Sequence, residues 1–329
     1  MSGAHQVFDE LPQRTLVTWT ALISAYVNNQ RPGKALDLFR QMQLEKVEPD
    51  LVTLTVVLSA CADLGALDAG EWIHTYVRKQ GIGQDIILTN ALINMYCKRG
   101  DINAAHQLFQ LADTRDVTTW TSTIMGHASH GRACEALELF KEMKSRNCRP
   151  NSVTFVGVLT ACSHAGLVEE GKRQWEKMIS CYNVKPNMAH YGCMVDLLCR
   201  SGKLDEAYGF VEAMPLQANA VIWRTLLGAC STEGNVRIGN QARKRLLELE
   251  PDCVADGVSM SNAYAKVGMW EEKERMRRRK GRRAPGCSLI EVGSTVHEFV
   301  AGDRRQVKMK EIHHVLEGMM HCSRNVECG

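Results

Sequence analysis

The sequence has little of what would place it in several common classes of protein. It contains no apolar run long enough to cross a bilayer, so no membrane association is expected. Its net charge is only +3 over 329 residues, below the strongly basic balance of proteins that bind nucleic acid regardless of sequence. Any affinity for nucleic acid must therefore come from one local face of the molecule.

The thirteen cysteines include no C-x-x-C pair, which removes the most common spacing of a structural metal site. Five of them precede a glycine by three or four residues: Cys61, Cys97, Cys162, Cys199 and Cys230. A recurring position of this kind calls for a small apolar residue, and free Cys behaves as one. Cys162 and His164 have the look of a ligand pair, but we expect core packing here and no metal. Free thiols fit a reducing compartment.

What the sequence does contain is a repeat. An apolar segment followed by a turn signal recurs along almost the whole chain, and the turn residues are Gln30, Gly65, Gly100, Gly131, Gly166, Gly202, Gly234 and Gly268. By subtraction, successive turns lie 35, 35, 31, 35, 36, 32 and 34 residues apart. Such a period predicts an all-α solenoid of helix pairs, because one pair cannot bury its apolar face alone and must stack on a neighbour.

Each unit is predicted to hold two helices, A and B. In the first full unit helix A spans residues 17–28 and helix B spans residues 32–44, in which Ala35, Leu38, Phe39 and Met42 share one helix face. Pro32 suits a first helical turn. A later unit repeats this face in Ala136, Leu137, Leu139, Phe140 and Met143.

Residues 4–12 match the end of a helix B whose helix A is missing, as a comparison with residues 105–109 indicates. We therefore interpret residues 1–15 as the remnant of a truncated repeat, and the chain as N-terminally truncated or a gene fragment. This stretch holds Asp9 and Glu10 and has the composition of neither a signal peptide nor an acid-poor transit peptide.

The unit that begins Leu16-Val17-Thr18-Trp19-Thr20-Ala21-Leu22-Ile23-Ser24 resembles a pentatricopeptide repeat. The 35, 35, 31 succession resembles the plant P-L-S subclass, in which standard (P), long (L) and short (S) repeats alternate. The resemblance implies a right-handed α-solenoid superhelix of helix-turn-helix repeats. Six repeats fill residues 16–219: P 16–50, L 51–85, S 86–116, P 117–151, L 152–187 and S 188–219.

Residues 220–283 resemble the E-type helical motifs of that subclass, through the strings Val221-Ile222-Trp223-Arg224-Thr225-Leu226-Leu227 and Leu247-Glu248-Leu249-Glu250-Pro251. Residues 284–329 resemble an E-plus extension, through Pro285-Gly286-Cys287-Ser288 and Val296-His297-Glu298-Phe299. A terminal helix is predicted over residues 311–320. The basic run in residues 274–283 could bind phosphates, although such a run is more often a solvated helix face.

The resemblance implies that each repeat binds one base of single-stranded RNA. In this family the fifth residue of helix A and the last residue of the repeat read the base, and the second residue is an apolar wedge beside it. An ionised Asp only accepts hydrogen bonds, so as a last residue it suits G or U. Asn can also donate and suits A or C. In the family pattern, Thr at the fifth position favours purines and Asn favours pyrimidines.

Carried over by position, Thr20 with Asp50 is expected to read G, Asn90 with Asp116 to read U, and Thr121 with Asn151 to read A. Thr55 with Asp85 would also read G, in a long repeat. Two pairs lack a polar fifth residue and receive no base: Val156 with Asn187, and Gly192 with Asn219. The expected wedges are Val17, Val52, Ile87, Thr118 and Val153. With its 5′ end at the N-terminus, the RNA would read G-(G)-U-A-N-N.

The simpler interpretation of each polar residue is a helix cap, a turn or a solvated side chain. For one pair alone that interpretation is preferable, and the regular set of pairs favours base reading. Two other classes of function remain open: a helical-repeat scaffold that binds proteins, and a truncated product without activity.

The family often ends in a zinc cytidine-deaminase-like domain, which needs H-x-E and P-C-x-x-C strings. No histidine here has Glu two places on, so we expect no enzyme, no catalytic residue and no cofactor. The resemblance implies a specificity factor for C-to-U RNA editing in a mitochondrion or chloroplast. Its ligand would be single-stranded organellar RNA, and a deaminase or another editing-complex protein would be recruited in trans through residues 220–303.

Overall fold

The computed structural model describes residues 2–65, 67–81, 85–251, 253, 255–277, 287–292 and 295–300. The chain divides into two units, residues 1–282 and residues 283–329. The helices of the first unit are α1 (Ser2–Asp9), α2 (Leu16–Asn28), α3 (Pro32–Leu44), α4 (Leu51–Leu64), α5 (Leu67–Gln80), α6 (Ile86–Arg99), α7 (Ile102–Leu111), α8 (Val117–Ser129), α9 (Ala133–Ser145), α10 (Ser152–His164), α11 (Val168–Ser180), α12 (Met188–Arg200), α13 (Leu204–Glu212), α14 (Ala220–Glu233), α15 (Val236–Leu249), α16 (Ala255–Lys266) and α17 (Trp270–Arg277).

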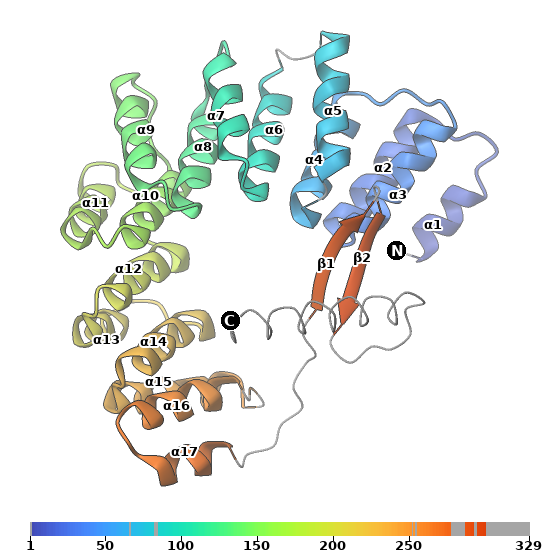
Figure 1. Cartoon of the computed structure of the whole chain (residues 1–329). Coiled ribbons are helices and arrows are strands. Elements are labelled where there is room, and N and C mark those ends of the chain that lie inside the picture. Colours follow the sequence, from blue (N-terminus) through green and yellow to red (C-terminus); the bar gives the residue numbers. More distant parts are fainter. Residues whose placement is uncertain are drawn as a thin grey trace, which may run out of the picture. The chain divides into compact units, whose positions relative to one another are not determined.

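Helices α2 to α17 form successive antiparallel pairs (Figure 1). Each even-numbered helix is the first of its pair, and it packs against the first helix of the next pair. The odd-numbered helices pack against the first helices on either side of them. This arrangement confirms the predicted all-α solenoid of helix-turn-helix units. Helix α3 has the predicted bounds of helix B, and α2 begins one residue before the predicted helix A.

The turn between the helices of a pair requires a left-handed backbone. All seven predicted turn glycines have positive φ, from 67° at Gly166 to 86° at Gly100, and Gln30 has φ 55°. Glycine adopts this conformation without steric cost, which explains why it marks the period in the sequence. Gln30 is the one member of this predicted set that carries a side chain.

Helix α1 packs on α2 in the way that the second helix of a pair packs on the first helix of the next pair, as α7 does on α8. Phe8 meets Trp19 edge-on with ring centroids 4.6 Å apart, and Phe109 of α7 meets Trp120 of α8 in the same way at 4.8 Å. The guanidinium groups of Arg14 and Arg115 lie over the respective Phe rings, at 5.0 and 4.6 Å. The sequence likeness of residues 4–8 to residues 105–109 is thus matched by equivalent packing.

The five cysteines predicted to pack in the core are buried: Cys61, Cys97, Cys162, Cys199 and Cys230. Three of them lie against glycines of neighbouring helices. A Cβ atom on Gly126 would come 2.1 Å from Cys97 Sγ. One on Gly171 or Gly239 would make an ordinary 3.5 Å contact with the Cβ of Cys162 or Cys230, but would come within 2.3 Å of Leu197 Cδ2 or 3.0 Å of Met260 Sδ. The absence of a glycine side chain therefore lets adjacent helices approach closely.

The second unit contains an antiparallel hairpin of β1 (Cys287–Val292) and β2 (Thr295–Val300), in which Cys287 pairs with Val300 and Val292 with Thr295. The sequence analysis did not predict these strands. The predicted terminal helix at residues 311–320, and the basic run beyond Arg277, lie outside the described residues. Among the described residues no helix has both the length and the apolar character needed to cross a membrane.

Candidate nucleic-acid interface

A row of apolar side chains is exposed at the start of the first helices. The second residue of α2, α4, α6 and α10 is Val17, Val52, Ile87 and Val153, whose exposed fractions are 74, 59, 63 and 54%. In α8 this position is Thr118, also exposed. Because the first helices pack side by side, these positions follow one another along one edge of the stack. The sequence analysis missed Val221 of α14, which is 65% exposed and continues the row.

The last residue of each predicted repeat lies immediately before the first helix of the next helix pair. Oδ1 of Asp50 accepts hydrogen bonds from the backbone N–H and the hydroxyl of Thr53, at 2.8 and 2.7 Å. Oδ1 of Asp85, Asp116, Asn151 and Asn219 accepts from backbone N–H groups in the same way. These residues are therefore N-caps, as the simpler sequence interpretation has it.

The cap occupies only one of the two polar atoms of each side chain. Within the described residues, Oδ2 of Asp50, Asp85 and Asp116 and Nδ2 of Asn151 and Asn219 have no hydrogen-bond partner. A carboxylate oxygen can only accept a hydrogen bond, whereas the amide nitrogen donates. Capping thus leaves one atom per residue whose chemistry differs between Asp and Asn.

Asn90 and Asp116 are in direct contact. Asn90 Nδ2 donates to Asp116 Oδ1 at 3.2 Å, from the fifth residue of α6 to the cap of α8. Burial opposes ionisation of Asp116, but hydrogen bonds from the Thr119 backbone and hydroxyl and from Asn90 outweigh it and hold the pKa of the carboxyl below its usual range. Asp116 is therefore an ionised acceptor near neutral pH. Asn90 is only 9% exposed, and its Oδ1 is buried with no partner among the described residues.

In two other predicted pairs, the fifth and last residues are joined through a buried threonine, a different one in each pair. Thr20 Oγ1 lies 2.6 Å from Thr53 Oγ1, which donates to Asp50 Oδ1. Thr121 Oγ1 lies 2.8 Å from Thr154 Oγ1, which donates to Asn151 Oδ1 at 3.0 Å. Thr53 and Thr154 are fully buried third residues of the following first helix. The structure therefore brings the fifth and last residues of both repeats into one hydrogen-bonded group.

The fourth predicted pair is not joined in this way. Thr55 Oγ1 donates to Leu51 O within its own helix at 2.7 Å, as Thr20 Oγ1 does to Leu16 O at 2.9 Å. The difference lies in the third residue of the next first helix, which is the apolar Leu88. Within the described residues no side chain links Thr55 to Asp85 by hydrogen bonds, in contrast to Thr20 and Asp50.

The two pairs without a polar fifth residue differ from each other. Asn187 Nδ2 donates to Ser152 Oγ at 3.2 Å, so its amide is partly occupied. Near Gly192 an open cavity of about 470 Å³ is lined by Ala189, Gly192, Asn219 and Val221, among others. These are the second, fifth and last residues of the predicted repeat 188–219 together with the second residue of α14.

The described residues show no arrangement suited to metal binding, since no group of three or more His, Cys, Asp or Glu side chains converges there. Burial raises the pKa of the Cys97, Cys162 and Cys199 thiols to about 12, so they are protonated and unreactive at neutral pH. His164 lies at the surface, with Nδ1 2.8 Å from Ala128 O, while Cys162 is buried.

Comparison with protein-family models gives matches along most of the chain. Models described as the PPR repeat family and the PPR repeat match residues 14–63, 87–116, 115–164, 153–182 and 182–215. A model described as the E motif matches residues 234–291, which overlap most of the predicted E-type region.

Curated relatives agree with these matches. The Arabidopsis thaliana pentatricopeptide repeat-containing protein At4g30700 is 41% identical over 96% of this chain and 40% of its own length. At1g59720, named chloroplastic/mitochondrial, is 40% identical over 95% and 52%, and At5g56310 is 42% identical over 97% and 67%. The chain thus spans about half or less of the length of the first two relatives.

Among solved structures, the pentatricopeptide repeat protein PPR10 in complex with an 18-nucleotide psaJ RNA element superposes with a TM-score of 0.66. The match covers 83% of this chain and 41% of PPR10, at 15% sequence identity. At that identity the likeness concerns the fold, and it agrees with the stacked helix pairs described above.

Proposed function

Since the chain belongs to the pentatricopeptide repeat family, we propose that it binds single-stranded RNA, with one base to each helix pair of the solenoid. The observation that carries the proposal is the arrangement of the first helices. Within the described residues α4, α6, α8, α10 and α14 each follow a cap whose second polar atom has no hydrogen-bond partner, and most of these helices carry an exposed apolar residue beside the cap. A capping interaction and a base contact can then be made by the same side chain.

The free cap atom selects the base by its hydrogen-bonding character. Oδ2 of Asp50 and Asp116 would accept from a ring N–H, which G and U present, and Nδ2 of Asn151 would donate to a ring acceptor, as in A. With Thr20, Asn90 and Thr121 at the fifth positions, the proposed register is G, U and A at the first, third and fourth places. Thr55 with Asp85 reads G at the second place with less selectivity, because no threonine joins the two.

The exposed apolar row would hold the bases apart. Each base would lie between the second residues of two successive first helices, at Val17, Val52, Ile87, Thr118 and Val153. Stacking contacts of this kind contribute about 1–3 kcal/mol per base. Val221 extends the row, so that the cavity beside Gly192 also has an apolar side chain on each side.

We assign the P, L, S, P, L, S repeats to residues 16–219 and E-type motifs to residues 220–283. On this basis the protein serves as a site-recognition factor for C-to-U editing of organellar RNA, without catalysing the reaction. The deaminase acts in trans and is recruited through residues 220–303. The E-motif match and the organelle named for At1g59720 support this assignment.

The test is fluorescence anisotropy on the full chain with RNAs of the form G-G-U-A-N-N, each place varied in turn. We expect saturable binding that weakens with salt, and about tenfold preference at the first, third and fourth places. Thr53→Val removes the link between Thr20 and Asp50, and should lower selectivity at the first place only. The matched control is Thr232→Val, an exposed threonine whose hydroxyl bonds only Gly228 O among the described residues.

Equal affinity for all RNAs would overturn the base-reading proposal. Absence of RNA binding by a folded protein would instead favour a scaffold that binds other proteins.

A further inference from the structure

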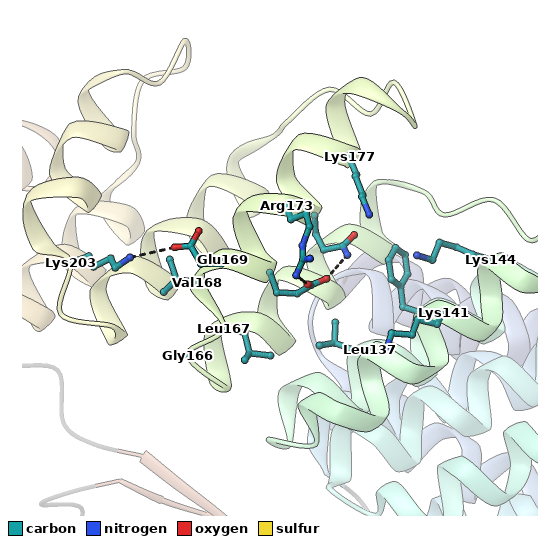
Figure 2. Close-up of a pocket in the computed structure, with 13 residues that line it drawn as sticks. Leu137, Lys141, Lys144, Gly166, Leu167, Val168, Glu169, Arg173, Lys177 and Lys203 are labelled. Carbon is teal, nitrogen blue, oxygen red and sulfur yellow. Dashed lines mark hydrogen bonds and ion pairs between the residues drawn. The ribbon is translucent and has the colours of Figure 1, made fainter.

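The cavity beside Gly192 lies on the first helices, where the bases are proposed to bind. It has a volume of about 470 Å³ and is lined by residues of α10, α12 and α14 and by the cap of α14. A larger open groove of about 840 Å³ lies between the second helices α9 and α11 (Figure 2). Phe140 and Val168 of that groove are buried, and the carboxylate of Glu169 lies 3.7 Å from Lys203 Nζ. The smaller cavity, by contrast, borders an open position on α12.

This open position is the fifth of α12, which has no side chain. A Cβ atom added to Gly192 would meet nothing within 4 Å, so no neighbouring helix occupies the space. In each of the preceding first helices, α2, α4, α6, α8 and α10, a side chain stands at this position: Thr20, Thr55, Asn90, Thr121 and Val156. The repeat 188–219 therefore offers a base more room than the repeats before it.

Asp196 lies one helical turn beyond this opening. Residues four apart share a helix face, and side chains lean toward the N-terminal end of their helix, so Asp196 leans toward Gly192. Both residues line the cavity. Among the first helices from α2 to α14, α12 alone has an acidic ninth residue, whereas the others have Ser24, Ser59, Asn94, Met125, Thr160 and Gly228. The carboxylate thus occurs in the helix that lacks the fifth side chain.

Two hydrogen bonds fix the carboxylate of Asp196 and leave one oxygen without a partner. Ser163 of α10 is 2% exposed, and its Oγ donates to Asp196 Oδ2 at 2.6 Å. Arg200 Nε donates to the same oxygen at 2.8 Å. Oδ1 of Asp196 has no hydrogen-bond partner among the described residues, and neither has Nδ2 of Asn219. The cavity is therefore lined by one fixed acceptor and one free donor.

We propose that the repeat 188–219 reads its base through Asn219 and Asp196, and that it selects a base with an exocyclic amine beside a ring acceptor, namely A or C. Asn219 Nδ2 donates to the ring nitrogen as in the proposed function, on which this inference rests. Asp196 Oδ1 accepts from the amine, because a carboxylate oxygen can only accept. The ring N–H of G or U would instead face the amide N–H of Asn219, donor against donor.

The ninth residue thus takes over the task of the missing fifth one. A base that enters beside Gly192 can extend toward Asp196, since no side chain stands between them. The sixth place of the RNA, which receives no base from the fifth residue of its repeat, then becomes a selective place. The simpler role of Asp196 is structural, as a partner of Ser163 and Arg200, and removal of the base amine separates the two roles.

The experiment measures binding of the full chain to G-G-U-A-N-X RNA by fluorescence anisotropy. The nucleoside X is A, C, G, U or purine riboside, which is adenosine without its amine. We expect A and C to bind more tightly than G and U, and A to bind about tenfold more tightly than purine riboside, because a hydrogen bond to a charged group is lost with the amine. Asp196→Ala should bind A and purine riboside equally and still discriminate against G through Asn219.

A second variant tests the same claim without removing the bonds of Ser163 and Arg200. Gly192→Val places a side chain in the opening, as Val156 does in α10, and should also bind A and purine riboside equally. The matched control is Gly209→Val in the second helix α13, where an added Cβ atom likewise meets nothing within 4 Å, and it should keep the preference for A.

Equal binding of A and purine riboside by the wild type would overturn the inference, and so would an unchanged preference for A in both Asp196→Ala and Gly192→Val. An equal loss in Gly209→Val would overturn the assignment to this cavity. The first, third and fourth places of the same RNA test the proposed function separately. If their preferences persist while the sixth place is unselective, only the inference fails, whereas loss of selectivity at all places rejects base reading itself.

Discussion

At the scale of single residues, one side chain can serve both as a helix cap and as a base contact. From sequence spacing alone, Asp50, Asp116 and Asn151 could each be a helix cap or a base contact, and the two roles are treated as competing interpretations. The two interpretations are compatible, because the cap uses Oδ1 and the second polar atom has no partner within the described residues. The link through Thr53 was not predictable, since it joins Thr20 to a residue 33 positions away whose threonine looks like an ordinary third helical residue.

A buried histidine makes stability depend on pH. His127 is 2% exposed, its Nε2 lies 3.2 Å from His106 Nδ1, and burial followed by the charges of His106 and Arg132 lowers its pKa to about 4. Its usual pKa is 6.5, so the unfolded chain binds a proton that the folded chain excludes between pH 6.5 and 4. Stability is therefore full above pH 6.5 and falls by roughly 3 kcal/mol toward pH 4.

Urea denaturation at a series of pH values measures this contribution. His127→Gln removes the titrating group, so its free energy of unfolding should fall less steeply between pH 6.5 and 4 than that of the wild type. The slope is the readout, and parallel curves for the two proteins would contradict the assignment.

At the scale of helices, small residues set how closely neighbours pack. Cys97 of α6 lies against Gly126 of α8, where a Cβ atom would be 2.1 Å from Sγ. We expect Gly126→Ala to destabilise the protein by about 1–3 kcal/mol, because the thiol and the helix must move apart. Thermal denaturation followed by circular dichroism measures the loss.

The matched control is Gly209→Ala in α13. A Cβ atom there meets nothing within 4 Å, and alanine has the higher helix propensity, so this variant should be as stable as the wild type or more so. Equal melting of Gly126→Ala and the wild type would show that the contact with Cys97 is looser than described.

The helices that follow residue 219 continue the pattern of helix pairs and add a cluster of ion pairs. Helices α14 to α17 form two further pairs, and the fifth residue of α14 is Arg224 in place of Thr or Asn. Arg224 Nε lies 3.0 Å from Oδ1 of Asp256, whose side chain is 7% exposed, and the guanidinium also pairs with Glu250. These hydrogen bonds occupy the fifth position that reads a base in the proposed repeats, so we place the end of the reading row at residue 219.

At the scale of the molecule, the repeat period predicted most of the fold. A recurring turn with a left-handed residue dictates helix pairs, and apolar faces that cannot be buried alone dictate stacking. The hairpin of β1 and β2 was not predicted because it lies outside the repeats, where the repeat period gives no information on secondary structure.

The central claim is that the fifth and last residues of a repeat choose its base, and one paired substitution tests it most directly. Asn90→Thr with Asp116→Asn converts the third repeat to the residues of the fourth, Thr121 with Asn151. The account predicts that preference at the third place of G-G-U-A-N-N RNA moves from U to A by about tenfold, with the other places unchanged. Asp101→Asn, at the cap of the second helix α7, is the control and should leave every preference as it was. Continued preference for U in the paired variant, or an equal change in the control, would contradict the account.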